Sequence, residues 1–207
     1  MSSRTTGDRP APEILTSIES DDWDGRDVTG ERHDQVAFVD VDMTEMIDQG
    51  AVFSGCAFRR VRFNASRHTD AAFLNCTFTR CNFFDAAFTG CKMVGSEFDG
   101  CSFDLLKVDG GDWSFARLSG AELRGVSFTD VRMREADLTG ARLEGATLQR
   151  ADLSGASLRL ADLSRCDLRG SDLSSLDPLS VNLRGAVVDL AQAVLIATAL
   201  GLDVRSG

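Results

Sequence analysis

Residues that carry chemistry are scarce in this sequence. It has no tyrosine and only two histidines, and it contains no glycine-rich phosphate loop, no Cys-x-x-Cys pair and no nucleophile motif. A chain without these groups has little with which to perform nucleophilic, acid–base or metal chemistry. We therefore expect no enzymatic activity, no catalytic residue, no metal site and no cofactor.

Targeting segments are absent as well. The sequence shows no signal peptide and no apolar run long enough to span a membrane, so we expect a cytoplasmic protein with no membrane partner. In a reducing cytoplasm the six cysteines are expected to be free thiols. The spacing of Cys56 and Cys76 nevertheless does not exclude a disulfide between them.

Basic residues are in the minority. The 207 residues include 32 Asp and Glu against 22 Lys and Arg, which gives a net charge of −10. We expect no nucleic acid ligand, because binding one requires a basic surface. An acidic chain suits a basic protein partner, and the alternative is that the acidity only keeps the protein soluble.

What the sequence has in abundance is a repeat of five residues. Between Ala136 and Leu173 it reads ADLTG, ARLEG, ATLQR, ADLSG and so on, and the register extends in both directions. A large apolar residue occupies every fifth place, with exceptions at His33, Asp48, His68 and Pro178. Two places earlier stands a small residue, and all six cysteines fall on this small position: Cys56, Cys76, Cys81, Cys91, Cys101 and Cys166.

A period of five fits neither a helix nor a flat strand, whose side chains repeat every 3.6 and 2.0 residues. A coil that turns a corner every five residues would point the large and the small residue inward and the other three outward. Stacked coils would pair edge to edge at about 4.8 Å and bury a continuous column of leucine and phenylalanine. The sequence therefore predicts a solenoid, and polar replacement of Leu143 or Phe98 should be severe.

This pattern resembles that of the pentapeptide repeat proteins. The resemblance implies an all-β fold, a right-handed quadrilateral β-helix of about eight coils, followed by a short C-terminal α-helix. We accordingly expect three parts. These are a disordered N-terminal tail at residues 1–20, the repeat β-helix at residues 21–185, and a C-terminal helix and tail at residues 186–207.

The periodicity changes in the last part. The segment from Asp189 to Leu200 contains mostly helix formers, with Asp189 as N-cap, Gln192 three residues later and Gly201 as the stop. The helix could cap the open end of the solenoid, or it could form a homodimer interface, and the two roles are compatible. The apolar residues expected at such an interface are Leu190, Val194, Leu195, Ile196 and Leu200.

Two places in the repeat are irregular. Leu106 is too large for a small position, so Leu105 and Leu106, together with Gly110 and Gly111, predict a local distortion. Asp48 and His68 are four pentapeptides apart and would stack if each coil has four sides. They are interpreted as a structural polar pair; the alternative is part of a metal or acid–base site, for which the sequence shows no third group.

Within the family, the chain looks most similar to the quinolone-resistance members, mycobacterial and plasmid-borne. The likeness rests on His68 before AAFLNCTF, on the interruption from Leu105 to Gly111, and on RGAVVDLAQAV before the helix. It implies a dimeric DNA mimic whose acidic rod binds DNA gyrase and protects it from quinolones or inhibits it. The alternative is a scaffold for another, non-gyrase protein, because fold does not dictate function.

The acidic surface that such a partner would contact can be placed by the repeat. Stacking of every fourth pentapeptide predicts one row of Asp112, Asp152 and Asp172, interrupted by Arg132. It predicts a second row of Glu97, Asp137 and Asp177, interrupted by Arg117. We expect the likeness to DNA to be strongest in the C-terminal coils, where a dimer would join two rows.

Overall fold

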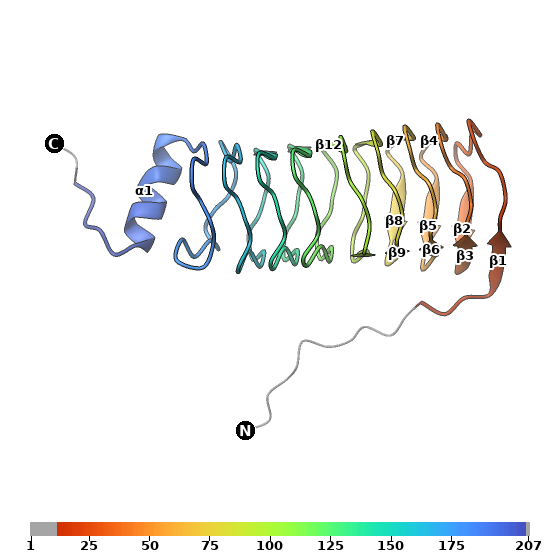
Figure 1. The fold of residues 1–207 in the computed structure, drawn as a ribbon, viewed down its shortest axis with the longest axis horizontal. Coiled ribbons are helices and arrows are strands. Elements are labelled where there is room, and N and C mark those ends of the chain that lie inside the picture. The colour runs from red at the N-terminus through yellow and green to blue at the C-terminus, as the bar shows by residue number, and fades with distance from the viewer. Residues whose placement is uncertain (1–11, 206–207) are drawn as a thin grey trace, which may run out of the picture.

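The computed structural model describes residues 12–205 as a rod of stacked coils that ends in one helix (Figure 1). Most of the tail predicted for residues 1–20 lies outside the described residues. The solenoid begins earlier than predicted, because Thr16–Glu19 already forms strand β1 and pairs in parallel with β3. The expectation of a disordered tail is therefore wrong for these four residues.

Within residues 12–205 the fold consists of fourteen short strands and one helix. The strands are β1 (Thr16–Glu19), β2 (Arg32–Asp34), β3 (Val36–Val39), β4 (Ile47–Gln49), β5 (Val52–Ser54), β6 (Ala57–Arg59), β7 (Arg67–Thr69), β8 (Ala72–Leu74), β9 (Thr77–Thr79), β10 (Ala87–Thr89), β11 (Glu97–Asp99), β12 (Lys107–Asp109), β13 (Ser127–Thr129) and β14 (Thr147–Gln149). The helix is α1 (Leu190–Ala199).

Every strand pairs in parallel with residues four pentapeptides away, and one coil is therefore four pentapeptides long. Three faces carry the sheets β1-β3-β6-β9-β11, β14-β13-β12-β10-β7-β4 and β2-β5-β8. The fourth face is held by isolated bridges such as Asp22 with Asp42 and Asp42 with Arg62. The ladder from Asp27 to Val187 makes eight steps of four pentapeptides and the one from Arg32 to Asp172 makes seven, close to the predicted eight coils.

Each corner is turned at the residue that closes the pentapeptide. From Ser20 to Gly170 that residue has a positive φ whether it is glycine, as at Gly140 (66°), or another residue, as at Asp85 (52°) and Leu160 (63°). Glycine adopts this left-handed conformation without steric cost, which explains its frequency at the fifth position.

The interior is the predicted column of large side chains. In the N-terminal half the rings lie face to face, with centroids 4.7 Å apart for Phe53 and Phe73 and 4.8 Å for Phe78 and Phe98. Trp113 stacks on Phe98 and contacts Phe128 edge-on. Beyond these rings, fully buried leucines such as Leu143 fill the core.

The predicted distortion lies in the coil that contains Leu106 and Trp113. Leu106 is buried in a small position whereas Leu105 points into solvent. On the fourth face, the ladder that begins at Asp22 ends at Ser102 and a new one begins at Glu122. No bridge joins Ser102 to Glu122 among the described residues. The bulk of Leu106 and Trp113 inside one coil offers a physical reason for this missing bridge.

Gly111 lies close against the backbone of Cys91 in the preceding coil, and Gly111→Ala should be strongly destabilising. A Cβ there would lie 2.1 Å from the carbonyl oxygen of Cys91, whereas a Cβ at Gly110 would meet nothing nearer than 3.9 Å. Both glycines have positive φ, so each alanine should cost about 1–2 kcal/mol of conformational energy. Overpacking should add about 1–3 kcal/mol at Gly111 alone.

Urea unfolding of the two single variants checks this prediction, with Gly110→Ala as the matched control. The free energy of unfolding should fall clearly further for Gly111→Ala. Equal losses in the two variants would mean that the close approach to Cys91 is unimportant.

At the C-terminal end the coils are closed by α1. Asp189 is the N-cap and forms the predicted capping box with Gln192, since each side chain bonds the other residue's backbone N–H. The amide of the buried Gln192 also donates to the carbonyl oxygens of Leu168 and Ser171 in the last coils.

The described part of the chain has no helix of the length and apolarity that a membrane span requires.

Candidate functional site

The first predicted acidic row is formed as expected. Asp112, Arg132, Asp152 and Asp172 follow one another along a single ladder of parallel bridges. Because this position in the pentapeptide points outward, their side chains lie on the surface of one face. The row is not purely negative, since Arg132 pairs with Asp112 at 3.0 Å and Arg134 pairs with Asp152 at 2.5 Å.

The second row is formed only in part. Glu97, Arg117 and Asp137 share a ladder that continues to Ser157 and does not reach Asp177 within the described residues. Arg117 pairs with Glu97 at 3.4 Å. Asp177 lies in the irregular turn at Pro178, where its carboxylate accepts a hydrogen bond from the Leu179 N–H.

Hydrogen bonds favour the charged form at three of the six predicted carboxylates, because they lower the pKa of Asp112, Asp137 and Asp152. Burial of Asp137 works against ionisation, but bonds from Ser119 and Thr139 outweigh it and lower the pKa of the carboxyl. In the N-terminal half the Arg62 guanidinium lowers the pKa of Asp42 to about 2. Three of the six predicted residues, Glu97, Asp112 and Asp152, share their charge with an arginine.

The net charge is concentrated at the other end of the rod. Residues 12–50 contain twelve Asp and Glu against two Arg, whereas residues 51–207 contain nineteen acidic against eighteen basic residues. The likeness to DNA was expected to be strongest in the C-terminal coils, but the net negative charge lies at the N-terminal end instead. We name the exposed carboxylates of the first coil the acidic rim; its members are Glu19, Asp21, Asp22, Asp24, Asp27 and Asp34.

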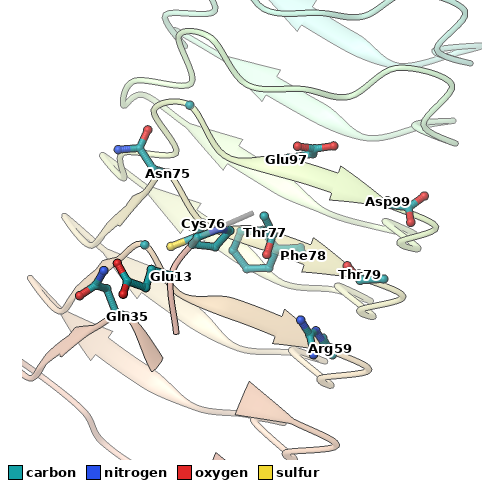
Figure 2. A pocket seen from close by; sticks show the side chains of 13 residues that line it. Glu13, Gln35, Arg59, Asn75, Cys76, Thr77, Phe78, Thr79, Glu97 and Asp99 are labelled. Atoms are coloured by element: carbon teal, nitrogen blue, oxygen red, sulfur yellow. The ribbon is translucent and has the colours of Figure 1, made fainter. Parts of the chain in front are cut away.

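A groove crosses the face that carries β6, β9 and β11. It has a volume of about 480 Å³ and runs between the segment at Pro12 and Glu13 and the strands around Thr77. Figure 2 shows the carboxylates of Glu97 and Asp99 on one side of it and that of Glu13 on another. Three carboxylates and the guanidinium of Arg59 line the groove, and Glu97 is one of the predicted partner-binding residues.

The five residues predicted for a dimer interface divide into two groups. Leu195 and Ile196 are partly buried and pack against the core of the last coils, so they dock the helix. Leu190, Val194 and Leu200 are exposed, with Leu190 at 83%. The helix therefore caps the solenoid with one side and leaves three apolar side chains available to a second copy.

The buried pair of Asp48 and His68 has a third group, Ser66, that the sequence-based interpretation did not include. Asp48 and His68 hydrogen-bond through Oδ2 and Nδ1, and the other ring nitrogen of His68 lies 2.9 Å from the Ser66 hydroxyl. These three side chains are at most 1% exposed, and Ser66 also donates to the Phe63 carbonyl oxygen. Without access to solvent this Ser-His-Asp arrangement cannot act on a substrate, so it is structural.

Groups that could hold a metal are absent from the described residues. The six cysteines are free, and five of them are buried in the small inward position. What the arrangement offers is a long, largely polar surface rich in carboxylates, which is suited to binding another macromolecule.

Comparison with known proteins agrees with this description. Residues 81–104, 109–140 and 136–174 match a family described as pentapeptide repeats, in eight copies. No curated protein matches the chain.

Among solved structures, a trypsin-treated form of QnrB1, a plasmid-mediated fluoroquinolone resistance protein, is 25% identical with a TM-score of 0.63. The match covers 93% of this chain and 99% of that one. A second trypsin-treated form is 26% identical with a TM-score of 0.53, over 93% and 99% of the two chains. Full-length QnrB1 is 22% identical with a TM-score of 0.53, over 91% and 99%, and supports the fold.

Proposed function

Because this chain is a pentapeptide repeat protein, we propose that it is of the quinolone-resistance type and binds DNA gyrase as a DNA mimic. The observation that carries the proposal is the likeness to QnrB1 over 93% of the chain, at 25% identity. Binding would modulate or inhibit gyrase and confer resistance to quinolones or other gyrase poisons. No enzymatic step is involved, and the protein would act in the cytoplasm.

The shape and charge of the rod support a role as a DNA mimic. Duplex DNA carries one negative charge per about 1.7 Å of its axis. Carboxylates in neighbouring coils are about 4.8 Å apart at closest. The rows therefore carry fewer charges per length than duplex DNA does, but they too run along the axis of a rod. We propose Glu97, Asp112, Asp137, Asp152, Asp172 and Asp177 as the partner-binding residues.

Dimerisation would extend the mimic. The exposed Leu190 and Val194 lie on α1 and the exposed Leu200 is its C-cap; α1 lies at the C-terminal end of the rod (Figure 1). We propose that two copies associate through this end. The C-terminal rows of the two rods would then lie at the centre of the dimer and the two acidic rims at its far ends.

A second candidate follows from the charge distribution. The net charge of −10 within residues 12–50 would suit a scaffold that binds a basic, non-gyrase protein through the acidic rim. Beyond that end the rod is nearly neutral, which favours the rim over the rows as the surface with the stronger field. The two candidates differ in partner and in the residues that contact it.

A DNA supercoiling assay with purified gyrase, with and without a fluoroquinolone, tests the gyrase proposal. We expect inhibition of supercoiling, or protection from the drug, at micromolar protein. The effect should weaken as salt rises, because the attraction between charged surfaces is screened. Absence of any effect on gyrase, or an effect that is independent of salt, would contradict the proposal.

Two charge-matched variants locate the surface. One carries Asp137, Asp152, Asp172 and Asp177 as Asn, and the other carries the rim residues Asp22, Asp24, Asp27 and Asp34 as Asn. Asn keeps an acceptor oxygen for local bonds such as that from the Asp24 N–H to Asp22. We expect the row variant to need at least tenfold more protein for the same effect on gyrase, and the rim variant to resemble wild type. The reverse result would move the binding surface to the rim.

A further inference from the structure

Two pairs of cysteines are stacked in neighbouring coils. Cys56 lies over Cys76 and Cys81 lies over Cys101, each pair separated by four pentapeptides and next to paired residues of the ladder. Neighbouring strands are about 4.8 Å apart, which falls inside the range of about 4.4–6.8 Å between the Cα atoms of a disulfide. All six thiols of the chain are free.

Access to solvent distinguishes the two pairs. Cys101 is partly exposed and lines a cavity of about 190 Å³ at the gap between Ser102 and Glu122, where the ladder is interrupted. Cys56 and Cys76 are both 0% exposed. Cys76 contributes to the wall of the larger groove (Figure 2), yet its side chain is inside the coil.

We propose that Cys101 and Cys81 form an oxidation-sensitive pair in which a hydroperoxide entering the cavity converts two thiols into a disulfide between coils. The Cys101 sulfur attacks the O–O bond, so an S–O bond forms, water or an alcohol leaves, and Cys101 becomes a sulfenic acid. The Cys81 sulfur then attacks the Cys101 sulfur, an S–S bond forms, and the S–O bond breaks with loss of water. The hydroperoxide is reduced and the two thiols are oxidised.

The electrostatics of the pair suit these roles. A hydrogen bond with Cys81 lowers the pKa of the Cys101 thiol, whereas burial raises the pKa of the Cys81 thiol. The exposed member is thus the better nucleophile toward the oxidant. The buried pair shows the same contrast, because a hydrogen bond with Cys76 lowers the pKa of Cys56. Exposure is therefore the feature that should separate the two pairs.

Serine variants of the two cysteines should fold. Serine already occupies the small inward position at Ser96 and Ser171, where the hydroxyl donates to the carbonyl oxygens of Phe73 and Leu148. Each of those carbonyls lies one coil earlier, as does the Phe78 carbonyl oxygen that the Cys101 thiol contacts at 3.3 Å. Cys101→Ser and Cys81→Ser should therefore retain the local hydrogen bond.

The test treats the full chain with hydrogen peroxide, alkylates the remaining thiols and maps tryptic peptides by mass spectrometry. Cleavage after Arg80, Lys92 and Lys107 places Cys101 in one peptide and Cys81 with Cys91 in another. Fragmentation, or a Cys91→Ala variant, separates the last two. We expect a cross-linked peptide pair joining Cys81 to Cys101, while Cys56 and Cys76 are recovered alkylated.

Three further results should accompany the bond. Oxidation should raise the Tm by several degrees, the rise should disappear on reduction with dithiothreitol, and it should be absent in Cys101→Ser. In Cys81→Ser the sulfenic acid at Cys101 should accumulate and react with dimedone.

The proposal is overturned if no thiol is oxidised, if Cys56 and Cys76 cross-link as readily, or if Cys101 is converted to sulfinic acid without a disulfide. None of these outcomes depends on gyrase binding.

Discussion

Replacing Leu143 with aspartate should leave the protein unable to fold. Leu143 is 0% exposed in the middle of the leucine column, and deleting such a side chain alone costs about 2–5 kcal/mol. The carboxylate would add the cost of a buried charge with no partner, which is several kcal/mol more. The sum is comparable with the whole stability of a typical domain, about 5–15 kcal/mol. Soluble yield and circular dichroism check the result.

A matched leucine serves as the control. Leu160 is 69% exposed and turns a corner with φ of 63°, a conformation that aspartate tolerates better than leucine does. Leu160→Asp should change the free energy of unfolding by no more than about 0.5 kcal/mol. If Leu143→Asp does not fold at all, Leu143→Ala should still be measurable, with a loss of about 3 kcal/mol. A stable Leu143→Asp protein would refute the buried column.

The period of five was sufficient to predict the coil and its interior because it constrains every side chain at once. As long as the chain turns a corner every five residues, the large and the small position both point inward. The burial of Phe98 and Leu143 therefore follows from the register. The same register contained the start of the solenoid, since Ile18 stands one pentapeptide before Trp23. That signal was missed because neighbouring residues of the tail keep no repeat.

The contacts of the candidate site were harder to predict than its rows. Residues four pentapeptides apart are stacked, which placed Asp112 with Arg132 correctly. Arg134 instead reaches Asp152, two residues away from the position stacked on it in the next coil. A long arginine side chain can reach several carboxylates, and small differences in coil geometry decide which one it pairs with. Sequence spacing alone could therefore locate a row of carboxylates without revealing which of them are paired.

Ser66 was missed for a different reason. It stands two places before His68, in the small inward series, so the sequence did contain it. Ser66 contacts the His68 ring because the small and the large position of the pentapeptide both point into the interior of the coil. In an ordinary strand, the side chains of residues i and i+2 point to the same face but need not contact each other. In this coil the interior is narrow, and the two side chains meet.

His68→Phe should be strongly destabilising even though phenylalanine is the residue that its neighbours use. Phe88 stacks on the His68 ring at 4.4 Å, so the new ring would fit. The substitution would, however, leave the carboxylate of Asp48 with no partner in the core, since its Oδ1 already lacks one among the described residues. Removing one partner of a buried pair costs about 3–5 kcal/mol.

The double variant Asp48→Leu with His68→Phe should restore stability, because it replaces both polar groups with side chains that this column already contains, such as Val28 and Leu148. Buried pairs exchanged for well-packed apolar residues are often neutral or more stable, and Ser66 keeps its bond to the Phe63 carbonyl oxygen. Urea unfolding of wild type, both single variants and the double variant should give a coupling energy of several kcal/mol. Additive losses would mean that Asp48 and His68 do not act as a pair, and a double variant as weak as His68→Phe would show that their polarity itself is required in this coil.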